Sequence, residues 1–383
     1  MFEYFSGNYP WNLGVVATLN SGGLIDEVDR ACRPIREAAL RGEDGGTTDF
    51  LAAWTGLTDQ LVIQAQDAEK AGHTRTAGQL YARATNYLAQ AERLQSASSP
   101  GRLECYRRVL ELQQKAFDLK DPSITRVLVP YEDTTLPAYF SAAPGEGRAP
   151  VMIMFNGLDS TKEHMYSSGH WQELAARGIS CLMVDCPGSG EALRLQELTA
   201  RVDSEAWATA CVDYLLTRDD VDPARIGLVG WSLGGYYAPR AAAFEKRLAL
   251  VVAWGANHNW GAVQRRRLER EGERPVPHYW EHVLWVWGYD DLDPFVDFAD
   301  QIHLDGVVEN IDVPFLICHG ENDRQIPLEY AHRSYDQAVN SPHRELRIFT
   351  QEEGGAEHIG LDHLSHVSVY IADWVADVLH RAS

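Results

Sequence analysis

The sequence predicts an α/β fold with a mainly parallel sheet, preceded by a helical N-terminal region. Over roughly the last two thirds of the chain, apolar runs of buried-strand length alternate with helix-compatible stretches, which is typical of parallel sheets. Residues 12–120 are instead rich in Ala, Leu, Gln, Glu and Arg, with few β-branched runs. The texture changes at Asp121-Pro122. We therefore expect a helical N-terminal cap domain at 1–122 and an α/β domain at 123–383.

The N-terminal region has the spacing of antiparallel helices that pack in pairs. Three long helices are expected at 50–71, 76–94 and 102–119, with glycine-rich breaks between them and Pro100-Gly101 as the clearest break. Such a region can cap a site in the following domain or bind a partner protein. The cap is the simpler interpretation.

The second domain opens with an expected β-hairpin, formed by strands at 125–131 and 136–141. A helix is expected at 167–177. Buried strands are expected at 151–155, 179–184, 226–229, 249–254, 313–318 and 345–350. In an alternating α/β arrangement, functional residues gather at the carboxyl ends of the strands.

A long insertion is expected at about 255–310, between two of these strands. Long insertions in compact domains are usually functional, and this one is placed to act as a lid. Its aromatic side chains either line a pocket or anchor helices. They are Trp260, Tyr279, Trp280, Trp285, Trp287, Tyr289, Phe295 and Phe298.

Composition excludes several classes of protein. The formal net charge of -21 and the low isoelectric point argue against binding to nucleic acid or to an anionic membrane surface. The six cysteines form no C-x-x-C pair and mostly lie in apolar runs, so we expect them to be reduced and buried. No metal-binding cluster, secretion signal or membrane-spanning run is recognisable, and we expect a cytoplasmic protein without metal or cofactor. A small-molecule substrate is the expected partner, and a homodimer is compatible with the sequence.

The most informative motif is Gly-x-Ser-x-Gly at 230–234, directly after the apolar run 226–229 and before a helix-compatible segment. This order of strand, sharp turn and helix exposes a serine nucleophile, here Ser232. Side chains at Gly230 and Gly234 would collide with neighbouring backbone. Because the pentapeptide alone is weak evidence, its partners along the chain matter more.

Suitable partners follow in the order acid, then histidine. Asp323 lies just past the strand expected at 313–318, with Glu321 as the alternative acid. His358 lies in the glycine-bearing loop after the last expected strand, with His363 and His366 as competitors. In a triad, His358 would accept the Ser232 proton, and Asp323 would orient the imidazole. The backbone amides of Leu233 and Leu158 are the expected oxyanion hole.

Three motifs together resemble the α/β-hydrolase superfamily. They are the residues 156–163 (Asn-Gly-Leu-Asp-Ser-Thr-Lys-Glu), 230–235 (Gly-Trp-Ser-Leu-Gly-Gly) and 353–358 (Glu-Gly-Gly-Ala-Glu-His). Within the superfamily they resemble a group with a helical N-terminal domain: FrsA-like esterases, the 2,6-dihydroxypseudooxynicotine hydrolase of nicotine breakdown, and fungal hydrolases that shorten polyketides. The resemblance implies cofactor-free hydrolysis, and several relatives cleave a carbon–carbon bond beside a ketone.

The resemblance also includes one departure. The nicotine-pathway enzyme is thought to use an additional acidic residue after the strand that follows the nucleophile, whereas residues 254–260 of this chain contain no carboxylate. Asn257 or His258 could serve in its place, or the substrate could differ. The proton donor that a carbanion leaving group needs could be His258, Asn257, or a tyrosine such as Tyr236 or Tyr289. The expected pocket residues are Asn257, His258, Trp260, Tyr236, Trp285 and Tyr289.

The sequence thus predicts an α/β-fold serine hydrolase that cleaves a carbon–carbon bond next to a ketone in an apolar or aromatic acyl substrate. A carboxylesterase acting on a bulky ester is the main alternative, because the triad chemistry is common to both reactions. A catalytically inactive hydrolase fold that serves as an interaction protein is a third alternative. An intact triad order argues against it.

Overall fold

The computed structural model describes residues 1–269 and 274–381. The chain divides into two compact units. One comprises Met1–Thr125 and Glu273–Val283, and the other comprises Arg126–Gly272 and Leu284–Ser383. The first division thus lies three residues after the boundary expected at 122/123. A short segment inside the expected insertion groups with the helical unit.

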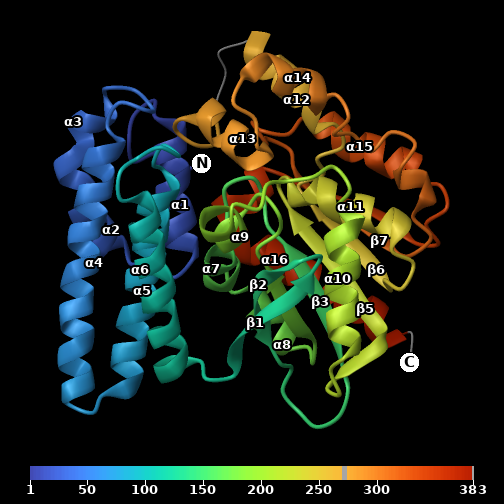
Figure 1. Ribbon diagram of the computed structural model, residues 1–383, viewed down its shortest axis with the longest axis horizontal. Coiled ribbons are helices and arrows are strands. Elements are labelled where there is room, and N and C mark those ends of the chain that lie inside the picture. Colours follow the sequence, from blue (N-terminus) through green and yellow to red (C-terminus); the bar gives the residue numbers. More distant parts are fainter. Residues whose placement is uncertain (270–273, 382–383) are drawn as a thin grey trace. The chain divides into compact units, whose positions relative to one another are not determined.

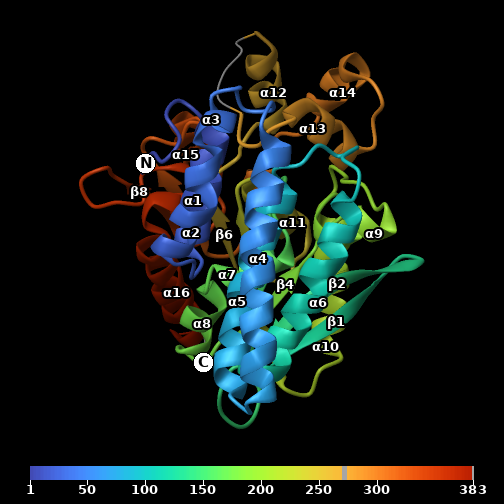
Figure 2. The ribbon, with the colours of Figure 1, turned by 90° about the vertical axis from the view of Figure 1, so that its left-hand side faces the viewer.

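The helical unit is built around three long helices, α4, α5 and α6, whose neighbours pack along their lengths (Figure 2). They lie close to the helices expected from the sequence. Aromatic packing supports one end of the unit, where the ring of Phe50 stacks on Trp54 and contacts Trp11 edge-on. The helices of this unit are α1 (Tyr9–Asn20), α2 (Ile25–Cys32), α3 (Arg36–Ala39), α4 (Thr47–Lys70), α5 (Thr74–Arg93) and α6 (Arg102–Lys120), with a 3₁₀ turn at Arg33–Ile35.

The segment 274–283, which we call the strap, is bound to the helical unit by polar contacts. The Glu281 carboxylate accepts hydrogen bonds from the Ser96 hydroxyl at 2.6 and 2.7 Å and from the Ser98 amide at 2.8 Å. The His278 amide donates to Asp44 at 2.8 Å, and its ring lies 3.1 Å from the Thr47 hydroxyl. These contacts explain why part of the insertion groups with helices that precede it by some 180 residues.

The second unit contains an eight-stranded sheet with the order β1-β2-β4-β3-β5-β6-β7-β8 (Figure 1). Strand β2 pairs with β4 antiparallel, and the pairs from β4–β3 onward to β7–β8 are parallel. This confirms the predicted mainly parallel sheet. The strands are β1 (Ile124–Tyr131), β2 (Thr134–Ser141), β3 (Ala149–Phe155), β4 (Ser180–Val184), β5 (Val221–Trp231), β6 (Leu250–Trp254), β7 (Phe315–Gly320) and β8 (Arg344–Phe349).

Helices cover both faces of this sheet, as the continuous apolar runs of its central strands require. α10 (Glu205–Leu216) packs beside α11 (Gly234–Phe244), and α8 (His170–Ala175) packs beside α16 (Leu364–Arg381). The two pairs lie on opposite faces of the sheet (Figures 1 and 2). The parallel register brings the loops that follow β3, β5, β6, β7 and β8 to one edge.

The helix expected at 167–177 is present but shorter, as α8, and a separate short helix, α7 (Lys162–Ser167), precedes it. Thr161 and His164 form a capping box that starts α7 early, and Gly169, with φ of 75°, separates the two helices. A third short helix, α9 (Gly190–Gln196), follows β4.

The expected insertion contains α12 (Trp260–Glu269), α13 (Tyr279–Trp287), α14 (Leu292–Ala299) and a 3₁₀ turn at Val308–Asn310. Several of its aromatic side chains pack on one another. Trp260 contacts Trp287 and Phe295, and Tyr289 contacts Phe295 and Phe298, with ring centroids 5.3 to 5.9 Å apart. These rings anchor the insertion's helices.

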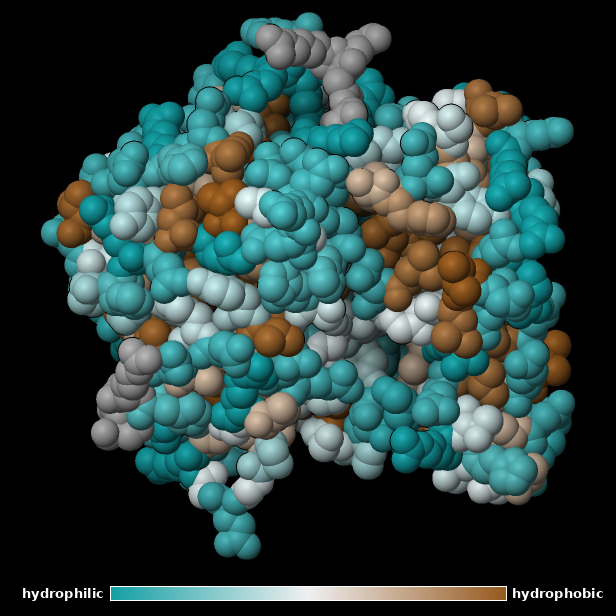
Figure 3. Space-filling model, turned by 180° about the vertical axis from the view of Figure 1, so that it is seen from behind, coloured by the Kyte–Doolittle hydropathy of each residue, from teal (hydrophilic) through white to brown (hydrophobic). Residues whose placement is uncertain are grey.

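The surface seen in Figure 3 is mostly hydrophilic, with hydrophobic residues scattered over it and a group of them gathered to the right of the centre of the view. All six cysteines are free; Cys105 is partly exposed and the other five are buried. Within residues 1–269 and 274–381, no helix combines the length and the apolar character that crossing a membrane requires.

Candidate active site

Ser232 lies in a tight turn between β5 and α11, with φ of 57°. A Cβ at Gly230 would lie 2.1 Å from the Gly234 carbonyl oxygen, and one at Gly234 would lie 2.8 Å from that of Phe155. Both glycines are therefore required by close backbone approach, as the sequence motif predicts. The Ser232 amide donates to the carbonyl of Trp254 at 2.9 Å, which ties the turn to the neighbouring strand β6.

Three side chains from three loops form a continuous hydrogen-bonded series at this edge of the sheet. His358 Nε2 lies 2.9 Å from Ser232 Oγ, and His358 Nδ1 lies 2.8 Å from Asp323 Oδ2. The Asp323 side chain is fully buried, and that of His358 is 6% exposed. A base in contact with the serine and an orienting acid behind the base form the geometry needed to activate the hydroxyl.

Asp323 is held as an anion. Burial acts to raise the pKa of its carboxyl, but the charge and hydrogen bond of His358, the nearby His319 and the Ile326 amide outweigh it, so the pKa is lowered. The amides of Gln325 and Ile326 donate to Oδ1 at 2.8 and 3.0 Å. An ionised Asp323 can stabilise the imidazolium that forms when His358 accepts a proton.

The alternative acid and histidines lie elsewhere. The Glu321 carboxylate accepts from the amide of Gln351. The rings of His363 and His366 contact each other, with centroids 5.3 Å apart. Of the candidates left open by the sequence, Asp323 and His358 are hydrogen-bonded to each other, and His358 contacts Ser232.

Two further residues position this series, and sequence reasoning missed both. The Asp362 carboxylate accepts from the amides of Gly355, Ala356 and Glu357 at 2.9 to 3.2 Å, which fixes the loop that carries His358. An Asp four residues after the loop histidine was the available signal.

The other is His319, at the end of β7. Its Nδ1 accepts from the Ala256 amide at 3.2 Å, and its Nε2 donates to the Ile326 carbonyl at 3.1 Å, which defines a neutral ring. Burial lowers the pKa of His319, in agreement with this arrangement. The ring joins the loop after β6 to the loop that carries Asp323, and the pattern His-Gly-x-x-Asp at 319–323 was its signal.

Of the two expected oxyanion donors, one directly follows Ser232 and the other follows a residue that lies close to Ser232. Leu233 is the next residue, at the start of α11. Leu158 follows Gly157, where a Cβ would lie 2.9 Å from Ser232 Cβ. The loop after β3 is therefore in van der Waals contact with the serine, where a second backbone donor is needed.

The expected pocket residues differ in how their polar atoms are used. His258 is buried, with Nδ1 2.8 Å from the Ser334 hydroxyl and Nε2 3.0 Å from Asp305. The Tyr236 hydroxyl donates to the Val202 carbonyl at 3.1 Å. Both groups are thus engaged by the protein, which argues against either as a proton donor to substrate.

The remaining candidates are also distinguished by their contacts. Trp260 and Tyr289 pack in the insertion, and the ring of Trp285 lies 5.6 Å from the guanidinium of Arg194. Asn257 is 3% exposed, and no hydrogen-bond partner for its Oδ1 occurs among the described residues. Its backbone nitrogen would lie 3.4 Å from a Cβ at Gly235, next to the serine turn. Among the described residues, Asn257 is therefore a pocket candidate with a buried and uncommitted side-chain oxygen.

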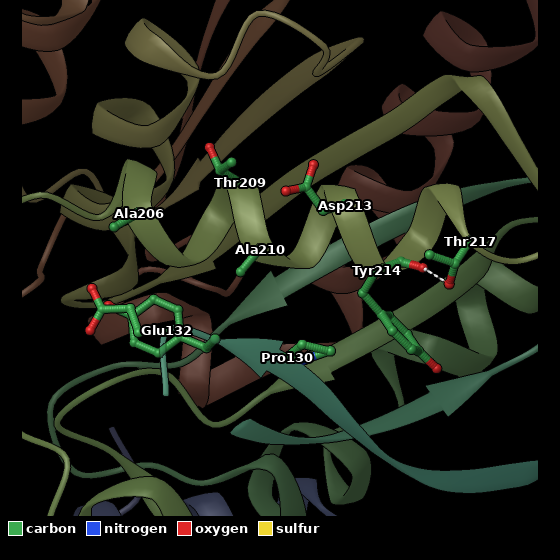
Figure 4. A pocket seen from close by; sticks show the side chains of 9 residues that line it. Pro130, Glu132, Ala206, Thr209, Ala210, Asp213, Tyr214 and Thr217 are labelled. Atoms are coloured by element: carbon green, nitrogen blue, oxygen red, sulfur yellow. Dashed lines mark hydrogen bonds between the residues drawn. The ribbon is translucent and has the colours of Figure 1, made fainter. Parts of the chain in front are cut away.

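A groove of ≈ 410 Å³ lies elsewhere on the second unit (Figure 4). It is bordered by residues 130–132 and by one face of α10, and none of the triad candidates lines it. Its polar side chains are already paired: Asp213 with Arg247 at 2.6 Å, and the Thr217 hydroxyl with the Tyr214 carbonyl at 2.7 Å. We assign it no role in catalysis.

This fold and this site define the class of protein. The chain belongs to the alpha/beta hydrolase family, whose model matches residues 152–378. It is 28% identical over 341 residues to a 2,6-dihydropseudooxynicotine hydrolase of Paenarthrobacter nicotinovorans, covering 85% of this chain and 83% of the relative. It is 32% identical over 313 residues to the hydrolase acrC of Aspergillus aculeatus, covering 70% and 73%.

A solved structure extends the likeness to the helical region. The crystal structure of a 2,6-dihydroxy-pseudo-oxynicotine hydrolase matches with a TM-score of 0.76 and 25% identity, over 96% of each chain. The family and these relatives establish that the protein is a hydrolase of the alpha/beta hydrolase family.

Proposed function

We propose that this chain is a serine hydrolase in which Ser232, His358 and Asp323 form the catalytic triad. We further propose that it cleaves a carbon–carbon bond next to a ketone in an apolar or aromatic acyl substrate. The observation that supports the triad is the continuous series of hydrogen bonds from Asp323 through His358 to Ser232, with distances of 2.8 and 2.9 Å.

The reaction would begin with attack of Ser232 Oγ on the substrate carbonyl carbon, while His358 Nε2 takes the hydroxyl proton. The carbonyl electron pair moves to oxygen, where the amides of Leu233 and Leu158 stabilise the charge. When this intermediate collapses, the bond to the leaving carbon breaks, that carbon keeps the electron pair as an enolate, and the proton held by His358 passes to the leaving group, which restores the neutral imidazole. Water then hydrolyses the acyl-enzyme, with His358 again acting as base.

The leaving group separates the two candidate reactions. An ester releases an alkoxide, which needs only the proton carried by His358, whereas a carbanion also needs an adjacent carbonyl as an electron sink. Asn257 supports the carbon–carbon reaction, because its buried amide has an uncommitted oxygen and an amide can hydrogen-bond to an enol or phenol. The similarity to a hydrolase of 2,6-dihydropseudooxynicotine gives further support.

A carboxylesterase is the second candidate. It is favoured by the lack of a carboxylate at 254–260 and by the engagement of His258 and Tyr236 in protein contacts. Those contacts remove two of the possible donors to a carbanion.

Product analysis would test the proposal. Purified protein would be given an aryl β-diketone, an acyl phenol and a matched ester of the same shape, with Ser232→Ala as the control. We expect the diketone or acyl phenol to be split at the carbon–carbon bond in a reaction that requires Ser232. Rapid ester cleavage with no carbon–carbon scission across the series would instead establish the esterase.

A further inference from the structure

Lys162 lies at the centre of a buried cluster that the triad chemistry does not use. Its ammonium group lies 2.8 Å from Asp185 Oδ2, 2.9 Å from Glu191 Oε2 and 2.9 Å from Glu163 Oε1. The Lys162 and Asp185 side chains are fully buried. An ammonium has three N–H donors, and here each one has a carboxylate.

The Lys162 ammonium is stabilised in its charged form in spite of its burial. Burial lowers the pKa of Lys162, but Asp185, Glu163 and Glu191 outweigh it and raise the pKa above its ordinary value. The surplus negative charge is shared with other donors. Arg126 donates to Glu191 at 2.6 Å, and the Tyr139 hydroxyl donates to Glu163 at 2.6 Å. Removing one partner from such a cluster leaves uncompensated buried charge.

The same cluster closes the loop that carries Leu158. Asp185 Oδ1 accepts from the Lys162 amide at 2.7 Å and from the Asn156 side chain at 3.2 Å, so one oxygen binds both ends of the loop 156–162. The position of Asp185 is itself restricted, because a Cβ at Gly190 would lie 1.9 Å from its carboxyl group.

A second contact fixes the middle of this loop against the serine turn. Ser160 Oγ accepts from the Gly157 amide at 2.9 Å and from Trp231 Nε1 at 3.0 Å. Trp231 directly precedes Ser232, and Gly157 contacts Ser232. The loop is thus held at its base by Asp185 and Lys162, and at its middle by the residue beside the nucleophile.

We propose that Lys162 is a positioning residue for the oxyanion hole: its bonds to Asp185, Glu163 and Glu191 hold the loop 156–162 so that the Leu158 amide faces the developing oxyanion. The proposal rests on the serine hydrolase function proposed above. It assigns a role to the Lys-Glu pair of the 156–163 motif, which lies outside the triad. Lys162 itself does not contact substrate, because its side chain is fully buried.

The test compares Lys162→Met with Leu215→Ala, which truncates a buried side chain on α10, a helix that carries neither the loop 156–162 nor a triad residue. Both variants and the wild type would be assayed on a chromogenic ester and titrated with an aryl trifluoromethyl ketone. That ketone adds to Ser232 Oγ and places an oxyanion in the hole, with the hydroxyl proton passing to His358.

For Lys162→Met we expect kcat to fall about 100-fold, the usual effect of losing one oxyanion donor, with KM changed less than about threefold. The inhibition constant of the ketone should rise in parallel. The pH midpoint of kcat/KM should stay at its wild-type value, because the bonds of His358 are untouched. Leu215→Ala should lower the melting temperature while keeping kcat and the ketone affinity.

If Lys162→Met kept wild-type kcat per folded molecule, or lost kcat without weaker ketone binding, the proposal would be overturned. If Lys162→Met does not fold, Glu191→Gln would be used in its place, because this change neutralises one carboxylate of the cluster. For Glu191→Gln we expect kcat to fall about tenfold, with a parallel loss of affinity for the ketone. If Glu191→Gln bound the ketone with the same affinity as the wild type, the proposal would be overturned. Failure of a fluorophosphonate to label Ser232 in the wild type would instead defeat the triad assignment, and this proposal with it.

Discussion

At the scale of single residues, the proposed chemistry depends on three side chains that are far apart in the sequence. Ser232, Asp323 and His358 follow β5, β7 and β8, and the parallel register brings these strand ends to one edge. They would act as nucleophile, orienting acid and general base, respectively. Loss of any one should therefore disable the whole unit.

We expect Ser232→Ala and His358→Ala each to lower kcat by about 10⁶-fold, and Asp323→Asn by about 10⁴-fold, with the fold intact. Steady-state kinetics on the preferred substrate, with circular dichroism as the control for folding, would measure this. If His358→Ala kept more than about a tenth of kcat, equivalent to about 1.4 kcal/mol, another base would be required and His363 would be tested next.

The sequence predicted these three residues because their order along the chain and their places after strands are fixed by the chemistry. It missed Asp362, His319 and Lys162, which act through contacts with backbone groups and buried charges. Local patterns mark the positions of Asp362 and His319, but they do not specify these contacts, which depend on how separate loops meet. For the same reason, the sequence left His258 and Tyr236 as candidate proton donors to the substrate. Only the structure shows the hydrogen-bond partners that already engage both side chains.

At the scale of elements, the buried strands were predictable because continuous runs of apolar residues have few alternatives in a parallel sheet. The helix expected at 167–177 is shorter because Gly169, with φ of 75°, sets its start, and the preceding helix α7, which the capping box at Thr161 starts, was not predicted. The strap was beyond prediction, since its partners on α4 and in the loop after α5 lie far away in the sequence.

We expect the strap to stabilise the helical unit through Glu281. Replacing Glu281 with Ala removes the acceptor for the Ser96 hydroxyl and the Ser98 amide, at a cost of about 1 kcal/mol because the site is partly exposed to solvent. Denaturant unfolding would measure the change. Glu111→Ala, at an exposed position on α6, is the matched control, and equal midpoints for the two variants would contradict this role.

At the scale of the whole molecule, buried neutral histidines link the stability of the fold to pH. His170 is fully buried, with Nδ1 2.8 Å from the Ser368 hydroxyl, and burial lowers its pKa to about 3. Burial also lowers the pKa values of His258 and His319. In the unfolded chain these rings would take up a proton near pH 6.5.

The sign of the effect follows from this difference. The folded state keeps the rings neutral, so their contribution to stability is complete above about pH 6.5 and is lost as the pH falls toward the folded-state pKa. For His170 we expect the free energy of unfolding to fall by about 1.4 kcal/mol per pH unit well below pH 6.5, and His258 and His319 should lower it further in the same direction. Denaturant titrations from pH 7.5 to 5 would measure the slope, and His170→Asn should reduce it. Constant stability over this range would refute the linkage.

The burial of the Lys162 amine also provides a way to measure how often the α/β domain opens. The chain has only five lysines, and Lys70, Lys115, Lys120 and Lys246 all lie at least partly in solvent, whereas the Lys162 amine is fully buried with every proton engaged. Amine-acylating reagents should therefore modify the other four in the native state and reach Lys162 only in molecules whose α/β domain has opened. Mass spectrometry of that one peptide would then count opening events of the α/β domain directly, without a spectroscopic label.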